Sequence, residues 1–396
     1  MMPTKRPLAS QDGRAKVPVA RSMNLEVLLA TSPDTETRGS LGIGSAKSHR
    51  KGSPAQSLVW IDAARVAAIL AVIAIHVVAS LVSNRALPGS WWFGNVMDSA
   101  ARWSVPVFVM ISGALVLHSS SADDPLLFYR RRLSRVLPPL VAWSAIYLVY
   151  GHLATNNPKS LDDAVAYILA GRPYFHLYFL YLITGLYLIA PFLRPMVALP
   201  DKRVLGIAVL VLLTMEMADN MILISGHGGG ANAVTRFVPY LGYFLAGAWL
   251  RELEPTRRRI VGAASIVVLG IGATAVGTDL LLANIGFGKG FYLYEYLSIT
   301  TVPTSLAIFV LFAWSGAFLD RTTNHNFRRL LSVLASSTLG IYVVHPLVIQ
   351  AFGTLGFGVR SFFVPLAALV SVLTVFLVSL VIVLVVRQMP GLRRLV

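Results

Sequence analysis

The run IDAARVAAILAVIAIHV holds three polar residues, Asp62, Arg65 and His76, in an otherwise apolar stretch. Arg65 and His76 are eleven positions apart, so in an α-helix their side chains would differ by about 20° and lie about 16 Å apart along the axis. Asp62, one helical turn before Arg65, shares the same stripe. Charged groups that face lipid are costly, so this stripe must face protein or a water-filled cavity.

These three residues allow a structural and a chemical interpretation. Asp62 can pair with Arg65 at i,i+3 spacing, or both can extend toward the membrane surface. His76 lies deeper, among Ile, Ala and Val residues. An imidazole is well suited to transfer protons near neutral pH, and an ionisable residue inside a membrane is a functional candidate by default. His76 is therefore the main catalytic candidate on this stripe.

A second group of basic residues lies in FYRRRLSRVLPPL, which places four arginines at positions 130–135. Arginines at the cytoplasmic end of a span are common as membrane anchors. Arg132 and Arg135 are also one helical turn apart and could together bind a phosphate, which suits guanidinium geometry. A phosphate-bearing ligand here would be a cytosolic metabolite, and coenzyme A is one such ligand. No P-loop or dinucleotide fingerprint accompanies these arginines.

Other polar residues interrupt the later apolar stretches. Each has a structural explanation as a packing or interfacial residue, and together they could line an acceptor site on the outer side. Asp98 and Arg102, four residues apart, can pair with each other. The candidates for the acceptor site are His176, Arg236, Tyr342 and His345.

The composition indicates which fold must position these groups. The chain of 396 residues is 56% hydrophobic and 13% charged, whereas about 25% charged residues is usual for a soluble domain. Mean hydropathy is +0.68, and apolar stretches of about 20 residues, long enough to cross a bilayer as helices, recur from Leu58 onwards. The predicted fold is an all-α, polytopic protein of the lipid bilayer. Ten spans are predicted, at 58–82, 95–117, 136–153, 176–198, 204–219, 235–250, 260–282, 296–319, 330–352 and 362–386.

Basic residues set the predicted orientation of these spans. Most of the 34 Lys and Arg residues fall in the N-terminal tail and in alternate connecting segments, and basic segments stay on the cytoplasmic side. With ten spans, both termini are predicted to lie inside. The same rule explains the net charge of +16, so no nucleic-acid partner is expected. The chain has no cysteine, which excludes disulfides and thiolate metal sites, and no metal is predicted.

The chain divides into two predicted parts. Residues 1–57 form a polar, basic tail rich in Ser, Gly and Pro, which is the composition of a disordered cytoplasmic segment. This tail does not have the pattern of a signal peptide, in which an apolar core precedes a small-residue cleavage site. Residues 58–390 form the predicted transmembrane domain, and all the candidate residues lie in it.

The motifs, taken in order, resemble the integral-membrane acyltransferase-3 family. Arg65 and His76 are similar to its Arg-x10-His motif, and Arg132 and Arg135 to its Arg-x-x-Arg motif. SVPVFVMISGALVL is similar to the block in its second helix, and STLGIYVVHPLV to its late Ser-x-x-x-Tyr-x-x-His block. The family usually begins with Asp-Gly-x-Arg, and this chain has Ala63 in place of that glycine.

Two further segments refine the resemblance. HLYFLYLITGLYLIAPFLRP and RFVPYLGYFLAGAWLRE look like the stand-alone branch of surface-polysaccharide O-acetyltransferases. The resemblance implies an enzyme of a bacterial cytoplasmic membrane. Such an enzyme moves an acyl group, usually acetyl, from cytosolic acyl-CoA to a hydroxyl of a cell-envelope glycan or its lipid-linked precursor.

The resemblance also implies roles for the candidate residues. Arg132 and Arg135 would bind the donor, acetyl-CoA or another acyl-CoA. His76 would act as general base on the acceptor hydroxyl or carry the acyl group transiently. Asp62 would orient Arg65, and these two residues join His76 as the catalytic group.

Two other classes of protein are compatible with the composition. A transporter or flippase for a lipid-linked sugar or small metabolite would also have about ten spans with charged residues near the midplane. Such proteins often contain inverted internal repeats, and no repeat relates the first five predicted spans to the last five. The third class is an accessory protein of polysaccharide assembly that binds without turnover. Release of CoA from acetyl-CoA in the presence of an acceptor distinguishes an enzyme from both.

Overall fold

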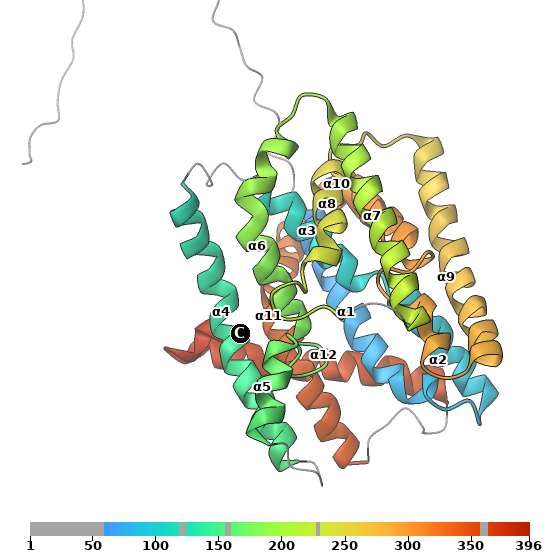
Figure 1. Cartoon of the computed structure of the whole chain (residues 1–396). Helices are drawn as coiled ribbons and strands as arrows, with labels where there is room; N and C mark the ends of the chain where they lie inside the picture. Colours follow the sequence, from blue (N-terminus) through green and yellow to red (C-terminus); the bar gives the residue numbers. More distant parts are fainter. Residues whose placement is uncertain (1–58, 119–123, 155–159, 227–229, 357–362) are drawn as a thin grey trace, which may run out of the picture. The chain divides into compact units, whose positions relative to one another are not determined.

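The computed structural model describes residues 59–118, 124–154, 160–226, 230–356 and 363–396. The tail predicted for residues 1–57 therefore lies outside the described residues. Every regular element in the described ranges is helical, which confirms the all-α prediction (Figure 1). The elements are α1 (Val59–Val82), α2 (Pro88–Ala101), α3 (Ser104–Val116), α4 (Pro125–Leu153), α5 (Leu161–Leu169), α6 (Tyr178–Val197), α7 (Lys202–Ser225), η2 (Val238–Tyr240), α8 (Leu241–Leu250), α9 (Arg257–Ile285), η3 (Lys289–Tyr294), α10 (Thr301–Thr322), α11 (His325–Thr354), α12 (Val364–Gln388) and η4 (Leu392–Arg394).

Nine segments in the described ranges are long and apolar enough to cross a membrane. One of them, Pro88–Val116, is a broken span made of α2 and α3. The predicted sixth span, 235–250, is instead a shorter apolar segment, Val238–Leu250. Its helix α8 is buried along most of its length, so neighbouring helices surround it. The chain is a polytopic membrane protein, and the inside location of both termini stays a prediction.

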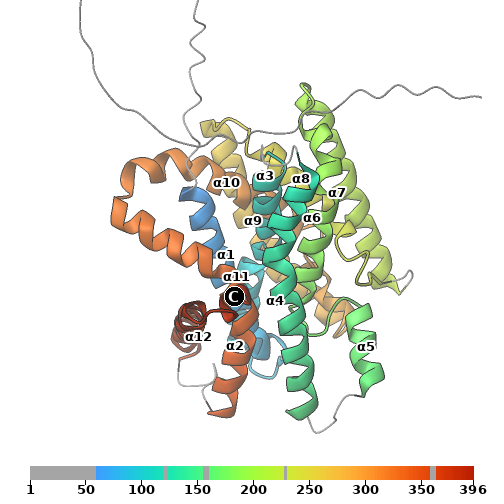
Figure 2. The ribbon, with the colours of Figure 1, turned by 90° about the vertical axis from the view of Figure 1, so that its left-hand side faces the viewer.

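Helix α1, which carries the predicted stripe, packs against α2, α3, α10, α11 and α12. Its buried residues occur in every turn, as expected for a helix that other helices surround. Figure 1 shows α4 on the left flank of α1 and α11, and Figure 2 shows the first part of α11 projecting beside α10 at the left margin. The buried residues of α11 begin at Leu331. The three stripe residues are half-buried, and the side chains of Arg65 and His76 line cavities between these helices.

The last long helix, α12, is oriented differently from the rest. Figure 1 shows it running across the bundle, and Figure 2 shows it nearly end-on. It packs on α11 and α1. Arg387 near its C-terminus donates to the main-chain oxygen of Ser336 at 2.6 Å and to the Ser337 hydroxyl at 3.1 Å. A cavity lies between α1, α11 and α12.

The short helix α8 crosses α3 at very close range because two glycines face the backbone of the opposite helix. A Cβ at Gly113 would lie 1.8 Å from the Phe244 carbonyl oxygen, and one at Gly247 would lie 1.9 Å from that of Met110. Small residues allow membrane helices to approach this closely. The crossing fixes the position of α3. Ser112 of this helix lines another cavity, which lies between α1, α3, α4, α6 and α11.

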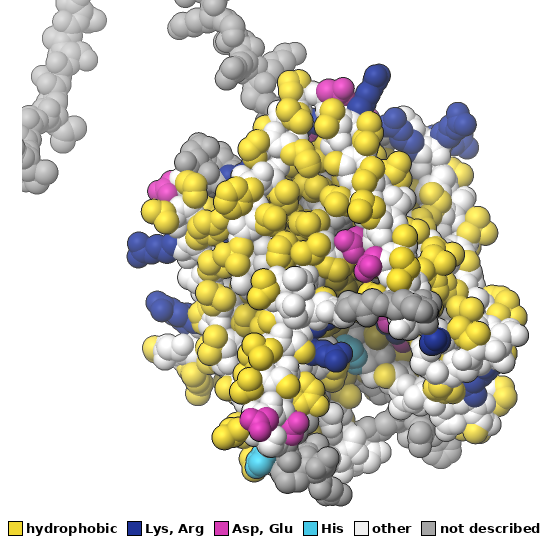
Figure 3. Space-filling model, viewed as in Figure 1, with side chains coloured by type: hydrophobic (Ala, Val, Ile, Leu, Met, Phe, Trp, Pro, Cys, Tyr) yellow, Lys and Arg dark blue, Asp and Glu magenta, His cyan; other side chains and the backbone are white. Residues whose placement is uncertain are grey.

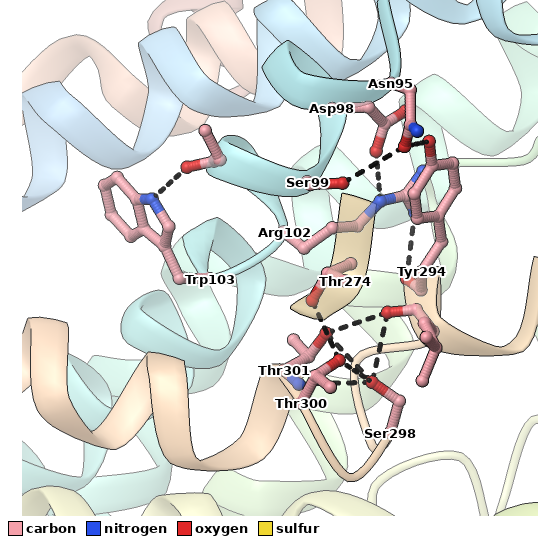
Figure 4. A network of polar contacts seen from close by, with 12 residues as sticks. Asn95, Asp98, Ser99, Arg102, Trp103, Thr274, Tyr294, Ser298, Thr300 and Thr301 are labelled. Atoms are coloured by element: carbon pink, nitrogen blue, oxygen red, sulfur yellow. Dashed lines mark hydrogen bonds and ion pairs between the residues drawn. The ribbon is translucent and has the colours of Figure 1, made fainter. Parts of the chain in front are cut away.

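A buried polar network holds the break between α2 and α3 (Figure 4). Asp98 and Arg102 form the predicted i,i+4 ion pair, and the Asp98 side chain is only 3% exposed. The Arg102 guanidinium lies 4.4 Å from the Tyr294 ring centroid and donates to the Tyr294 carbonyl oxygen at 3.1 Å. Tyr294 donates its hydroxyl to Asn95 at 2.6 Å. These extra bonds offset the desolvation of a buried ion pair.

The surface seen in Figure 3 suits a membrane environment. Hydrophobic side chains cover much of it over α6 and α7, while several Lys and Arg side chains stand at its upper and left margins. Ile207, Leu210 and Met215 on α7 are among the exposed apolar residues. Soluble monomers rarely expose apolar patches of this extent, whereas lipid solvates them.

Candidate active site

Three predicted arginines line one cavity of about 350 Å³, which we call the arginine pocket. Arg65 comes from α1, and Arg132 and Arg135 come from α4. The remaining walls come from α3, α6 and α11 and include Phe179 and Tyr342. The structure thus brings together basic residues that are far apart in the sequence.

Two of the three arginines of this pocket lack the partners that usually neutralise clustered charge. Arg132 and Arg135 have neither an ion pair nor a side-chain hydrogen bond with any described residue. Arg65 lies 3.9 Å from Asp62, at the predicted i,i+3 spacing. Like charges around one cavity repel each other, so an anionic ligand would stabilise the arrangement. The pocket has the composition of an anion-binding site.

Helix α4 positions its two arginines because it begins well before the predicted span. The helix starts at Pro125, with Asp124 as N-cap. The Asp124 side chain accepts hydrogen bonds from two backbone N–H groups of the first turn, at 2.9 and 3.2 Å. Such a cap satisfies groups that a helix start leaves unpaired, and proline is favoured at the first position. Arg132 and Arg135 therefore lie on regular helix, on neighbouring turns of one face.

Three histidines from distant parts of the sequence meet in the interior. The His76 ring on α1 stacks on that of His345 on α11, with centroids 5.3 Å apart and an interplanar angle of 26°. His176, just before α6, lies 5.6 Å from His345 in an edge-to-face arrangement. Phe175 packs edge-to-face on His76 at 4.9 Å. Two residues predicted for the acceptor site are thus neighbours of the predicted base.

The surroundings of His176 disfavour its protonated form. Burial, followed by the charges of the neighbouring imidazoles, lowers the pKa of His176, because desolvation disfavours the protonated ring. Within the described ranges, no group of three or more His, Asp or Glu side chains is placed to hold a metal ion.

The hydrogen bonds of His345 determine which of its nitrogens carries the proton. Nδ1 lies 2.8 Å from the Tyr342 carbonyl oxygen and 3.2 Å from that of Ile341. Because a carbonyl oxygen only accepts, Nδ1 carries the hydrogen, and Nε2 of the neutral ring keeps a lone pair. Nε2 is buried and has no hydrogen-bond partner in the described part of the chain. A buried acceptor without a partner costs free energy, and a proton or a ligand donor at Nε2 would recover it.

Tyr342 connects the arginine pocket to the histidines. It lines the pocket, and its ring centroid lies 5.9 Å from His345 and 5.3 Å from His176. Its hydroxyl donates to the main-chain oxygen of His176. The predicted pair Tyr342 and His345, one turn apart on α11, therefore leads from the pocket into the histidine cluster.

A second cavity, of about 480 Å³, reaches the His76 side chain and is called here the apolar chamber. It lies between α1, α11 and α12. Its lining residues on α11 begin at Ile349, after His345, whereas those of the arginine pocket end at Tyr342, before it. The two cavities therefore lie on opposite sides of the histidine pair along this helix.

Arg236 is not brought together with the other candidates. It lines neither of the two cavities. Its guanidinium donates to the carbonyl oxygens of Ala170 and Ala231, the latter at 2.8 Å. These bonds join the end of α5 to the segment before η2. A role of Arg236 in acceptor binding stays a prediction.

Sequence reasoning missed the α12 residues of the chamber. Ser371 and Thr374 line it, and their spacing of three places them on one face of an otherwise apolar helix. The two hydroxyls within LVSVLTVF are the signal that identifies them. Phe175, which packs on His76, was also missed, because an aromatic residue near a predicted interface has an ordinary explanation.

Comparison with protein families matches residues 58–386 to the acyltransferase-3 family model, whose description is an acyltransferase domain. The matched range contains every candidate residue and both cavities. Neither a curated protein nor a solved structure shows significant similarity to the chain.

Proposed function

Since the chain belongs to the acyltransferase-3 family, we propose that this membrane acyltransferase is an O-acyltransferase of the bacterial cell envelope. It moves an acetyl or related acyl group from cytosolic acyl-CoA to a hydroxyl of an envelope glycan or its lipid-linked precursor. One observation carries the proposal: an arginine pocket, Tyr342, and the stacked pair His345 and His76 follow one another through the interior. The proposed location is the bacterial cytoplasmic membrane.

The donor part of the proposal rests on the arginine pocket. Acyl-CoA carries several phosphates, and arginine binds phosphate through charge-assisted, often bidentate hydrogen bonds. Arg132 and Arg135 have no competing partner among the described residues, and Arg65 lines the same cavity. Asp62, 3.9 Å from Arg65, orients that guanidinium. The pantetheine arm then extends past Tyr342 toward the histidines.

The chemical step is the attack of the acceptor hydroxyl on the thioester carbonyl. His76 removes the hydroxyl proton while the new C–O bond forms, and the tetrahedral intermediate expels the CoA thiolate as the C–S bond breaks. The proton on the imidazolium then passes to the thiolate, which leaves CoA and an ester. In the alternative route, a ring nitrogen carries the acyl group before the acceptor receives it. Both routes need an unprotonated imidazole beside the thioester.

The two stacked histidines have different parts in this scheme. His76 lines the apolar chamber, so it is the imidazole that an acceptor can reach. His345 is held in one orientation by two main-chain carbonyls, and its stacking positions His76. The lone pair on His345 Nε2 offers a second site for the proton in transit.

An assay with purified protein tests the proposal. Protein in lipid nanodiscs receives acetyl-CoA labelled in the acetyl group, together with lipid and polymer fractions of a bacterial envelope. We expect CoA release and label in one fraction, and mild alkali should remove the label because O-esters hydrolyse readily. Nanodiscs without protein are the control. Protein that binds acetyl-CoA but transfers no label to any fraction would overturn the proposal and favour a binding or transport protein.

A further inference from the structure

The apolar chamber is a second space that reaches the proposed base. Its walls include His76 from α1, together with residues of α11 and α12. The arginine pocket, which suits a charged donor, lies on the other side of the His76 and His345 pair. A transfer reaction needs two ligands to meet at one base, so the chamber is the place from which the acceptor hydroxyl can approach.

The walls of the chamber are uncharged. None of its described lining residues is Lys, Arg, Asp or Glu, and Val77, Ile349, Phe352 and Val370 supply apolar contact. A charged ligand group would lose its hydration here and gain no ionic partner. The chamber therefore suits a neutral ligand with a large apolar part.

Three hydroxyls interrupt these apolar walls, those of Ser80, Ser371 and Thr374. Serine and threonine in membrane helices often donate to a carbonyl oxygen three or four residues earlier, as Thr184 and Thr338 do at 2.7 and 2.8 Å. The three chamber hydroxyls have no hydrogen-bond partner among the described residues. They remain available to a ligand that carries a few polar atoms.

We infer that the apolar chamber binds the acceptor, and that the acceptor is a neutral hydroxyl compound on a hydrocarbon carrier. The inference rests on the proposed acyl transfer and names its acceptor class. The hydrocarbon part packs on Ile349, Phe352 and Val370. The hydroxyl that is acylated meets His76, and nearby polar atoms of the acceptor bond to Ser371 and Thr374.

Two other occupants fit the chamber less well. A glycan without a hydrocarbon part presents many hydroxyls, and each buried one needs a partner, whereas the described walls offer one imidazole and three hydroxyls. The acyl chain of a long-chain donor is wholly apolar and would leave those hydroxyls unpaired. An acetyl group is far too small to fill about 480 Å³.

An introduced thiol can report occupancy, because the chain has no cysteine of its own. The Ser371→Cys variant in lipid nanodiscs is labelled with a maleimide in the presence of methyl or decyl β-glucoside. The control is Leu373→Cys, on the same helix but 46% exposed and outside the chamber. Each buried methylene strengthens binding up to about fourfold. We therefore expect decyl glucoside, and not methyl glucoside, to slow labelling of the Ser371→Cys thiol at least about fivefold, with no such change in the control.

The outcomes separate this inference from the proposed function. Equal protection by the two glucosides, no protection by either, or protection by decanoyl-CoA alone would overturn the inference. Release of CoA from acetyl-CoA by the wild-type protein is measured with the same glucosides. Equally fast release with both leaves acyl transfer intact and refutes the amphiphilic acceptor. Protection that depends on chain length, without transfer of the acetyl label to any envelope fraction, supports the binding site and refutes acyl transfer.

Discussion

The arginine pocket and the apolar chamber differ modestly in volume, about 350 and 480 Å³, but have opposite chemistry. The pocket contains three arginines, and the described walls of the chamber contain no charged residue. Both cavities use α1 and α11 as walls. On α11, His345 lies between the residues of the two cavities, and its ring stacks on that of His76, which lines the chamber from α1.

Under the proposed function, this contrast is explained by two ligands that come from two different phases. A phosphate-bearing donor comes from water, and its charge is matched by guanidinium groups. A largely apolar acceptor comes from the lipid, and it loses no hydration when it binds between the apolar walls of the chamber. In the proposed reaction the thioester reaches the histidines between α1, α6 and α11. Closure of this site around both ligands would exclude water, strengthen electrostatic interactions and limit hydrolysis of the donor.

The largest effect is expected at the boundary between the two cavities. His76→Ala should lower kcat for acyl transfer about 10²- to 10⁴-fold, the usual contribution of a general base. The Kd for acetyl-CoA should stay unchanged, because His76 is not part of the arginine pocket. Rates of CoA release and equilibrium binding of labelled acetyl-CoA measure the two quantities. A variant with normal thermal stability and full activity would remove the role assigned to His76.

A smaller effect is expected when the charged side alone is changed. The double variant Arg132→Ala/Arg135→Ala should raise the Kd for acetyl-CoA about 10- to 100-fold. A hydrogen bond to a charged group contributes about 1.5–3 kcal/mol when it is shielded from water, and the exposure of Arg135 and the partial exposure of Arg132 reduce that contribution. Protection of the Ser371→Cys thiol by decyl glucoside should persist in this background. Arg131→Ala, an exposed neighbour on the same helix that lines neither cavity, is the control. Equal acetyl-CoA affinity in wild type and double variant would contradict the phosphate site.

The parts of this site that could be predicted from sequence are those that depend on one helix. The spacing of Arg65 and His76 determines that both lie on one stripe, and each of them does line a cavity. The meeting of His176, His345 and His76 depends on packing between helices, so each residue retained a separate structural explanation in the sequence. The unpaired Nε2 of His345 follows from hydrogen-bond geometry that no sequence pattern records.

In the fold, too, the features of single segments could be predicted from sequence, whereas those that depend on packing between helices could not. Hydropathy predicted the apolar segments, because burial in lipid depends on local composition. It did not predict that α8 is short and enclosed by protein, since that depends on the close crossing at Gly113 and Gly247. The transverse course of α12 depends on its packing against α11 and α1, and for that reason its chamber hydroxyls were missed.

A third change tests whether ligand binding in one cavity can be weakened without an effect on the other cavity. Gly113→Ala should destabilise the protein by about 1–3 kcal/mol, because the added methyl overlaps the Phe244 carbonyl oxygen across the α3–α8 crossing. It should also weaken acetyl-CoA binding, since Ser112 on α3 lines the arginine pocket. The chamber receives no residue from α3, so thiol protection by decyl glucoside should remain. Thermal unfolding and both binding assays measure these effects.

The matched control for this change is Gly262→Ala on α9, where an added Cβ meets no atom within 4 Å. This substitution should be neutral or stabilise the helix by up to about 1 kcal/mol, because alanine has the higher helix propensity. If Gly113→Ala weakened glucoside protection and acetyl-CoA binding equally, the cavities would not be independent.

The smallest expected effect isolates one hydroxyl of the chamber. Thr374→Val keeps the shape of the side chain and removes a hydroxyl that has no partner among the described residues. A neutral hydrogen bond contributes about 0.5–1.5 kcal/mol, so the KM for decyl glucoside should rise about two- to tenfold. Thr374→Ser, which retains the hydroxyl, should stay closer to wild type. The KM for acetyl-CoA should be the same in all three proteins, because α12 contributes no residue to the arginine pocket. A change in the KM for acetyl-CoA with none in that for the glucoside would assign the chamber to the donor and reverse the comparison between the two cavities.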